Sequence, residues 1–283
     1  HWEKFQNELF QIKTREGHIL ALKPMNCPHH VQIFDRRPMS WRELPQRYAS
    51  TTKMYRDEQT GELNGLVRVR AITIDDAHVF CRRGEIKEEF SKVWDIIDEF
   101  YKTIGFDLNV RLSFHDPKNK EKYLGTAEMW QFAENQLREI AKEKGMASEE
   151  ILGEAAFYGP KIDFTANDSL GREWQVATIQ LDINMPERFD LTCVNEKGEK
   201  ERIVMVHSAI MGSIERYLAI LLEHFNGALP LWLSPVQAAV LPISDKLNDY
   251  AHKIADELVA EGIRTETYGR SDTIGKKIRE AET

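Results

Sequence analysis

Three side chains that commonly bind transition metals lie far apart in this sequence, each in a short polar or turn-forming segment. They are Cys27 after Lys23-Pro-Met-Asn26, His78 after two aspartates, and His207 before Ser208. One thiolate and two imidazoles would give zinc three protein ligands and leave a fourth position open, whereas a structural zinc site is normally closed by four. The residue types therefore indicate a metal site that can receive water or substrate.

The spacing of these three residues leaves other interpretations open. Their long separations match no local zinc signature. A lone cysteine is often a small buried apolar residue, and a lone histidine is often a hydrogen-bonded polar side chain. His78 and Cys81 form a rival pair, but no second pair completes it.

Two arginines stand beside acidic residues, in Arg56-Asp57-Glu58 and in Glu215-Arg216. Guanidinium groups bind phosphates and stabilise the charge that develops on phosphoryl oxygens. The alternative is a set of surface ion pairs, which are common and contribute little to stability. Neither G-x-G-x-x-G nor the Walker A pattern occurs in the sequence. A nucleotide would therefore be held by side chains and not by a glycine-rich loop.

Seven segments in a fixed order give the chain a family resemblance. They are Lys23 to His30 (KPMNCPHH), Tyr55 to Glu58 (YRDE), Gly65 to Arg70 (GLVRVR), Asp75 to His78 (DDAH), Gly153 to Lys161 (GEAAFYGPK), Gln180 to Asp182 (QLD) and His207 to Arg216 (HSAIMGSIER). Through them the chain resembles the threonyl-tRNA synthetases, a family of class II aminoacyl-tRNA synthetases, over essentially its whole length.

The resemblance implies one Zn²⁺ per chain, held by Cys27, His78 and His207, and Mg²⁺ bound with ATP. The residues expected to bind ATP are Arg56, Glu58, Arg68, Gln175 and Arg216. Within that set, Arg56 would contact the α-phosphate and Glu58 the adenine edge. Arg216 would pack against the bound nucleotide.

The resemblance also implies a threonine pocket. Asp76 would receive the substrate ammonium group, with Tyr158, Gln180 and Lys161 beside it; Lys161 would pair with carboxylate or phosphate charge. The expected catalytic residues are Arg56, Lys161 and Arg216. Ile74 stands where some family members carry a glutamine. His1 matches a histidine that some members are proposed to use near the tRNA 3′ end.

The implied function is ATP-dependent activation of L-threonine and its transfer to tRNA(Thr), with zinc reading the substrate's amino and hydroxyl groups. Two alternatives remain. Another class II synthetase, such as one for proline or serine, shares the ATP-binding pattern, although proline has no hydroxyl for a metal to read. A non-catalytic relative would be expected to lose Arg56 or Arg216, and both are present. The expected partners are ATP, L-threonine and tRNA(Thr), with a homodimer in the full-length protein.

Composition is that of an ordinary globular chain. The 283 residues are 42% hydrophobic and 30% charged, with a net charge of −8. A negative net charge does not indicate nucleic-acid binding, so any contact with tRNA needs a local basic surface. The three cysteines form no disulfide framework, which favours the cytoplasm. No apolar run approaches the roughly 18 residues of a membrane span, so no membrane partner is expected.

Hydrophobic periodicity predicts the elements that must position these residues. We expect helices at residues 85–104, 127–144, 208–226 and 245–261, and strands at residues 55–58, 65–80, 161–165, 172–183, 202–206, 236–243 and 263–267. Residues 8–34 predict a hairpin and then an irregular turn at residues 24–28. The strand–helix–strand order after residue 235 predicts a parallel pair.

These elements predict an α+β fold. We expect a class II antiparallel β-sheet flanked by helices over residues 1–232, followed by a truncated α/β anticodon-binding domain at residues 233–283. The chain starts without Met and stops within an amphipathic helical pattern. We therefore expect a fragment that lacks motif 1 of the class II fold, an editing domain and the rest of the anticodon domain.

Overall fold

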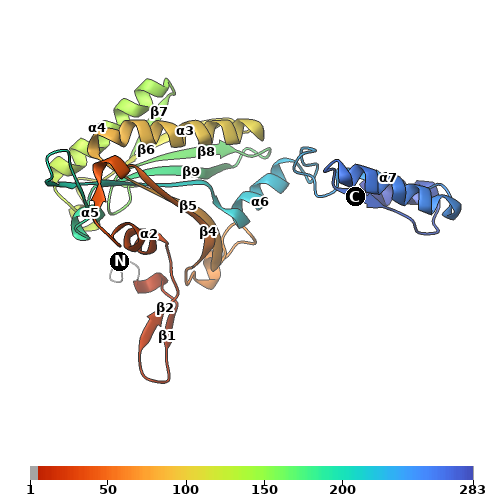
Figure 1. The fold of residues 1–283 in the computed structure, drawn as a ribbon, viewed down its shortest axis with the longest axis horizontal. Helices are drawn as coiled ribbons and strands as arrows, with labels where there is room; N and C mark the ends of the chain where they lie inside the picture. Colours follow the sequence, from red (N-terminus) through yellow and green to blue (C-terminus); the bar gives the residue numbers. More distant parts are fainter. Residues whose placement is uncertain (1–5, 283) are drawn as a thin grey trace. The chain divides into compact units, whose positions relative to one another are not determined.

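The structure, a computed structural model, describes residues 6–282. The chain divides into two compact units, His1–His224 and Phe225–Thr283 (Figure 1). The predicted boundary between residues 232 and 233 falls inside the second unit. As a functional boundary it stays a prediction.

The first unit is built on a seven-stranded sheet with the spatial order β4-β5-β12-β9-β8-β6-β7. Its strands are β4 (Gln46–Tyr55), β5 (Ala71–Cys81), β12 (Val204–Ser213), β9 (Glu173–Asp182), β8 (Lys161–Asn167), β6 (Leu108–Phe114) and β7 (Ser148–Leu152). Neighbouring strands are antiparallel except for β6 and β7, which are parallel. The predicted antiparallel sheet is confirmed, and β6 and β7 are strands that the periodicity did not predict.

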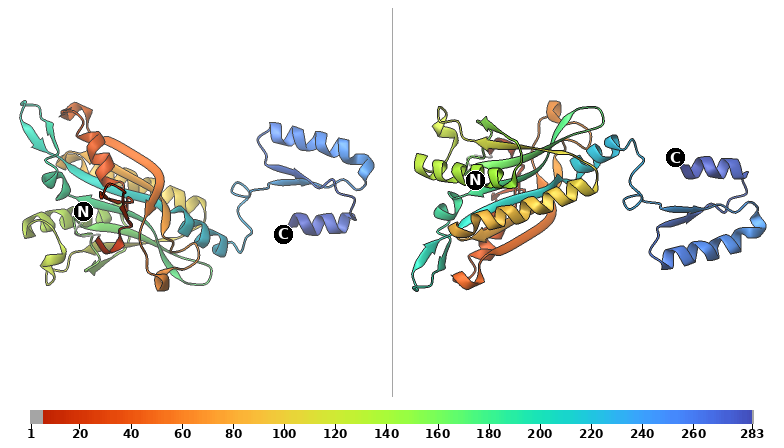
Figure 2. Two further views of the ribbon diagram at one scale, coloured as in Figure 1. Left: turned by 90° about the horizontal axis from the view of Figure 1, so that it is seen from below. Right: turned by 90° about the horizontal axis from the view of Figure 1, so that it is seen from above.

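Two long helices pack on this sheet (Figures 1 and 2). Helix α3 (Ile86–Thr103) contacts β9 and β12, and α4 (Ala127–Lys144) contacts α3 and β6. Helix α3 buries Phe90, Trp94 and Ile97 at three- and four-residue steps, as an amphipathic helix does. Both helices lie where the sequence predicted them.

The N-terminal segment supplies a hairpin and a short helix. Strands β1 (Gln11–Lys13) and β2 (Ile19–Ala21) pair antiparallel, as predicted. The irregular turn predicted at residues 24–28 is wrong in its second half, because α2 (Cys27–Phe34) begins there. Pro28 is acceptable in the first turn, where its missing N–H is not needed. The helix therefore presents Cys27 at its first position.

Two strand predictions were displaced along the chain. The strand predicted at residues 55–58 is β4, which ends at Tyr55, and the strand predicted at residues 65–80 begins only at Ala71. The segment between them is an irregular loop whose ends meet where Arg56 N donates to Arg70 O at 2.9 Å. Arg56 therefore leaves the sheet at the base of this loop.

The helix predicted at residues 208–226 is wrong in its first part. Residues 208–213 continue β12, and helix α6 is Ile214–His224. Ser208 pairs with Ala77 on β5 and with Ile179 on β9. Because a strand lies on either side, the ladder overrides the local helical pattern.

Smaller elements complete the first unit. A three-stranded sheet joins β3 (Met39–Ser40), β10 (Thr192–Val194) and β11 (Lys200–Arg202), and a one-turn helix, α5, spans Met185–Arg188. Met39 of β3 and Cys193 of β10 share a core cluster with α2, in which Phe34 stacks on Phe80 with ring centroids 4.6 Å apart. This cluster anchors α2 against β5.

The second unit contains β13 (Ala238–Val240), α7 (Asn248–Ala260), β14 (Thr265–Thr267) and α8 (Ile274–Glu282). Strands β13 and β14 are parallel, with Ala238 opposite Thr265, so the predicted parallel pair is confirmed. Within residues 6–282, no helix has both the length and the apolar character needed to cross a membrane. The whole described chain is α+β, as predicted.

Candidate active site

A cavity of about 330 Å³ lies beside the central strands β5, β12 and β9. The residues predicted from the sequence that line it are Cys27, Arg56, Asp76, Tyr158, Gln175, Gln180 and His207. Its volume lies in the range of small-molecule sites. Motifs that are distant in sequence thus converge on one cavity of suitable size.

The predicted metal ligands lie close together; Cys27 and His207 line this cavity, and His78 does not. One ligand atom from each of Cys27, His78 and His207 lies within 4.8 Å of the other two, and Cys27 Sγ is 3.6 Å from His207 Nδ1. His78 is fully buried, and its Nε2 finds no hydrogen-bond partner among residues 6–282. A buried nitrogen without a partner is costly. The donor set and this free nitrogen therefore fit a zinc ion.

Both histidines are held by a second polar group. His207 Nε2 lies 3.0 Å from Asp182 Oδ2, and His78 Nδ1 lies 2.7 Å from His30 Nδ1. Partners of this kind fix the ring orientation and tautomer of histidine ligands in metal sites. Asp182 and His30 occur in quoted motifs, but the sequence analysis gave them no role. Only the folded sheet shows which ligand each one touches.

The surroundings shift the pKa values of the two histidines in opposite directions. Burial lowers the pKa of His207, but the Cys27 thiolate and the Asp182 carboxylate outweigh it and raise that pKa to about 10. Burial, together with the charge of His207, holds the pKa of His78 well below its usual range. The site favours a positive charge between Cys27 and Asp182, which a metal ion can supply in place of a proton, and it keeps His78 in the neutral form that binds metals.

Asp76 lines the same cavity next to this cluster. Burial raises the pKa of Asp76 to about 6, although His207 and a hydrogen bond with Asn26 oppose the rise. A buried carboxylate of this kind is stabilised by a cationic partner. The position therefore suits a cationic ligand group; the role of Asp76 toward the substrate stays a prediction of the family resemblance.

Three arginines gather near the cavity. The Nε of Arg56 is buried and has no hydrogen-bond partner within the described part of the chain. Arg68 pairs with Glu58, with 2.7 Å between Nη2 and Oε2. Burial lowers the pKa of Arg216, and the charges of Arg68 and Arg56 lower it further. Because these cations repel one another, the arrangement suits a polyanion such as a nucleoside triphosphate.

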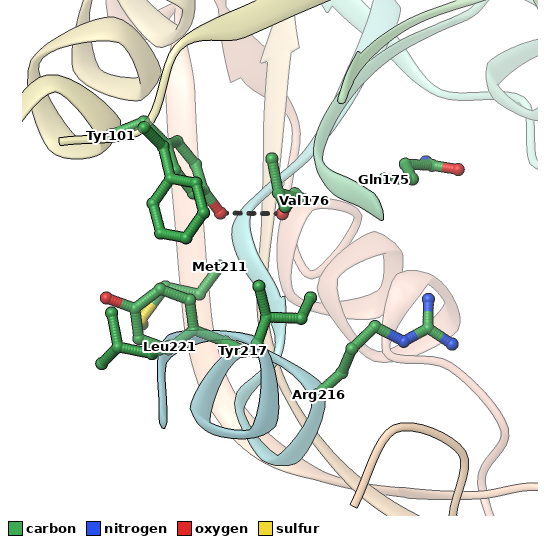
Figure 3. Close-up of a pocket in the computed structure, with 9 residues that line it drawn as sticks. Tyr101, Gln175, Val176, Met211, Arg216, Tyr217 and Leu221 are labelled. Carbon is green, nitrogen blue, oxygen red and sulfur yellow. Dashed lines mark hydrogen bonds between the residues drawn. The ribbon is translucent and has the colours of Figure 1, made fainter. Parts of the chain in front are cut away.

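Arg216 lies in the first turn of helix α6 and borders a small, mainly apolar recess (Figure 3), not the main cavity. Its Nε donates to the carbonyl oxygen of Val67 at 3.0 Å. In Figure 3 the side chains of Arg216 and Gln175 extend to the same side, away from Tyr101. Gln175 lines both the recess and the cavity, so it connects the surroundings of Arg216 with the main site.

Two carboxylates fix the junction between β12 and α6. Glu215 accepts hydrogen bonds from N and Oγ1 of Thr73, at 2.9 and 2.8 Å. Asp75 Oδ2 accepts from the backbone N–H groups of Ile210 and Met211, where the pairing of β12 with β5 shifts register. They hold the backbone that carries Arg216. The sequence analysis assigned neither of them.

The remaining predicted residues lie at the margin of the site. Lys161, Glu58 and Arg68 are outside the lining of the cavity. The Lys161 ammonium pairs with Asp163, a buried acid that the sequence analysis did not consider. Ile74 lines the cavity, and His1 lies outside the described residues. Of the predicted nucleotide-binding residues, Arg56 and Gln175 therefore line the cavity, and the others lie outside its lining.

Comparison with known proteins assigns both parts of the chain. Residues 10–225 match the family described as the tRNA synthetase class II core domain (G, H, P, S and T), and residues 237–283 match the anticodon binding domain family. The first match covers most of the chain. The chain therefore belongs to the class II tRNA synthetases.

Individual relatives narrow the assignment. The threonine–tRNA ligase of Cytophaga hutchinsonii is 49% identical over 285 residues, which cover 100% of this chain and 44% of that protein. That of Flavobacterium johnsoniae is 50% identical with the same coverage. The RNA binding domain of threonyl-tRNA synthetase from Cryptosporidium parvum has a TM-score of 0.92 at 41% identity, over 99% of this chain and 71% of that one. Within class II, the chain is a member of the threonyl-tRNA synthetases, and it spans less than half the length of these two curated relatives.

Proposed function

We propose that the protein activates L-threonine with ATP and transfers it to tRNA(Thr), and that zinc reads the amino and hydroxyl groups of the amino acid. The observation that carries this proposal is the cluster of Cys27, His78 and His207: Cys27 and His207 line a cavity that Asp76 and Arg56 also line, and His78 is fully buried next to them. A metal-ligand set beside a buried acid, and beside an arginine whose Nε has no hydrogen-bond partner among the described residues, suits an amino acid and a phosphate together.

In the activation step, a carboxylate oxygen of threonine attacks the α-phosphorus of ATP, and pyrophosphate leaves. Mg²⁺ bound with ATP would neutralise part of the phosphate charge. Negative charge grows on the phosphoryl oxygens during this displacement. Arg56, with its buried and unpaired Nε, and Arg216, held at the start of α6, stabilise that charge. Glu58 and Arg68 would contact the rest of the nucleotide. No protein nucleophile is needed.

In the transfer step, a ribose hydroxyl at the tRNA 3′ end attacks the carbonyl carbon of threonyl-adenylate, and AMP leaves. The part of the chain that matches the anticodon binding family supports a tRNA partner. The anticodon contacts would come from that second unit. The chemistry stays in the first unit, where the cavity lies.

Cys27, His78 and His207 would hold the zinc ion, which when bound supplies an electrophilic centre for lone pairs on the substrate. Asp182 and His30 keep the two imidazoles in place, and Asp76 accepts from the substrate amino group. Valine has the shape of threonine without its hydroxyl, and shape alone discriminates by only about 1–3 kcal/mol. A site prepared for an oxygen would reject valine more strongly and would reject serine poorly.

An ATP–pyrophosphate exchange assay on the full-length gene product tests this function. Threonine should support exchange best among threonine, serine, valine and proline. Preferred exchange with proline would point to another class II synthetase. No exchange with any of the four would favour a non-catalytic relative.

We also propose a homodimer in the full-length protein and a cytoplasmic location. The dimer follows from the family resemblance and is tested by light scattering on the purified protein. The location is supported by the three cysteines, which are all free thiols in the structure, as expected in a reducing compartment. Fractionation of cells expressing a tagged protein tests it.

A further inference from the structure

A buried carboxylate lies next to the proposed amino-acid site. Asp163 on β8 is 4% exposed. Its Oδ2 accepts hydrogen bonds from Ser113 Oγ at 2.7 Å and from the Lys161 ammonium. Its Oδ1 accepts from Gln175 Nε2 at 2.8 Å and from Thr178 Oγ1 at 2.9 Å. Four donors from strands β6, β8 and β9 thus converge on one acid.

Two of these donors belong to the cavity wall, because Gln175 and Thr178 line it. A carboxylate can only accept hydrogen bonds, whereas amides and hydroxyls can donate or accept. Asp163 therefore fixes the orientation of the Gln175 amide and the Thr178 hydroxyl, because both must donate to it. With its NH₂ group directed to Asp163, Gln175 has its oxygen Oε1 left for a ligand.

The order of hydrogen-bond donors and acceptors that Asp163 sets continues along the cavity wall to the proposed metal ligands. Thr178 gives its proton to Asp163, so its oxygen accepts from Gln180 Nε2 at 3.3 Å. Gln180 Oε1 in turn accepts from the Tyr158 hydroxyl. The Tyr158 ring stacks on His207, with centroids 4.8 Å apart. One carboxylate thus orients a chain of polar groups that ends beside the cluster of Cys27 and the two histidines.

We propose that Asp163 is a positioning residue that sets the donor and acceptor pattern of the amino-acid site. The resemblance places Gln175 among the ATP-binding residues, but Gln175 lines the same cavity as Asp76. With Asp163 in place, it presents its oxygen there, which suits the N–H donors of the amino group of an amino acid. The inference rests on the function proposed above and adds a residue that does not itself touch the substrate.

The substitution Asp163→Asn makes a directional prediction because Lys161 can only donate. The asparagine oxygen must face Lys161, so its NH₂ group must face Gln175 and Thr178. Gln175 would then accept with its oxygen and turn its own NH₂ group toward the cavity. That NH₂ group would then face the N–H groups of the substrate's amino group, so two hydrogen-bond donors would meet without an acceptor. Ser113→Ala is the matched control, since it removes a hydrogen bond to the same acid from a residue outside the cavity lining.

The test compares the full-length gene product with its D163N and S113A variants in pyrophosphate exchange. For D163N we expect the KM for threonine to rise by at least about tenfold, while the KM for ATP and the bound metal change less than about threefold. S113A should stay within about threefold of the parent for both substrates. An unchanged KM for threonine in D163N, or equal increases for both substrates, would overturn the proposal.

A second readout needs no catalysis and separates this proposal from the proposed function. NMR of the Gln175 side-chain amide should show its NH₂ protons exchanging with solvent at least about tenfold faster in D163N than in the parent or in S113A. Equal exchange in all three proteins would overturn the orienting role. If the parent protein supports no pyrophosphate exchange with any amino acid, the proposed function fails. The NMR comparison of amide-proton exchange still decides the role of Asp163.

Discussion

His78 on β5 and His207 on β12 are direct partners in the antiparallel ladder, and their ring centroids lie 4.5 Å apart. Cross-strand partners share one face of a sheet, so the sheet itself brings the two imidazoles together. Only Cys27 has to be supplied from elsewhere, at the first position of α2. The site therefore depends on strand register, because a slip of one residue would turn one ring to the other face.

Metal content follows from this geometry. The purified protein should carry about one zinc per chain, and Cys27→Ala or His207→Ala should lower the occupancy at least about tenfold. Elemental analysis after gel filtration measures this. Cys193→Ala, which removes a buried thiol from the core cluster beside α2, should retain the metal. Parental zinc content in C27A would contradict the assignment.

His30 should control how tightly the metal is held. In His30→Asn, the amide oxygen can take the place of Nδ1 and still accept from His78; in His30→Gln the amide lies further out, near the position of Nε2. We expect H30N to stay near the parental zinc affinity and H30Q to lose about 10–100-fold. Competition with a chromophoric chelator gives the affinities. Equal affinities in the two variants would assign His30 to packing alone.

Arg56 and Arg216 should act mainly on adenylation. Alanine at either position removes a cation from the developing phosphoryl charge, so pyrophosphate exchange should fall by at least about tenfold, or about 1.4 kcal/mol. Arg37→Ala is the control, since it breaks an exposed pair with Glu43 that belongs to none of the seven motifs and lies outside the cavity lining. Pyrophosphate exchange at the parental rate in R56A or R216A would mean that the substituted arginine only forms a surface ion pair.

Tyr101 should stabilise the sheet beneath Arg216. Its hydroxyl lies 3.0 Å from the carbonyl oxygen of Val176 and 2.8 Å from that of Ile210 (Figure 3 shows the former contact). Val176 is the extra residue where the pairing of β8 and β9 shifts register. Tyr101→Phe should therefore cost about 1–3 kcal/mol of unfolding free energy. Urea denaturation measures this, with exposed Tyr250→Phe as a control expected to stay within about 0.5 kcal/mol; equal stability of the two variants would contradict it.

The sequence was informative where a pattern is local. Helices α3 and α4 show their period directly, and Gly145 ends α4 in the left-handed conformation at φ 68°. The first residues of motif His207 to Arg216 also look helical, yet they form a strand because β5 and β9 flank them. That competition depends on residues far away in sequence, so no local pattern could show it.

Some residues of the candidate site could be identified from the sequence, and others could be identified only from the fold. The resemblance supplied Cys27, His78 and His207, but not Asp182, His30 or Asp163. Each of these three acts through a contact between elements that are distant in sequence. A buried acid or histidine has no periodic signature of its own. Its partner becomes visible only when the register of the sheet is known.

The central claim is that the metal cluster reads a hydroxyl group, and amino-acid selection tests it most directly. Pyrophosphate exchange should be measured side by side with threonine, serine and valine on the full-length gene product. Serine keeps the hydroxyl and lacks one methyl, so it should be activated only about 10–200-fold less well than threonine. Valine would place a methyl group where the site requires an oxygen, so its exchange should fall well below that of serine. Valine activated as well as serine would contradict the account.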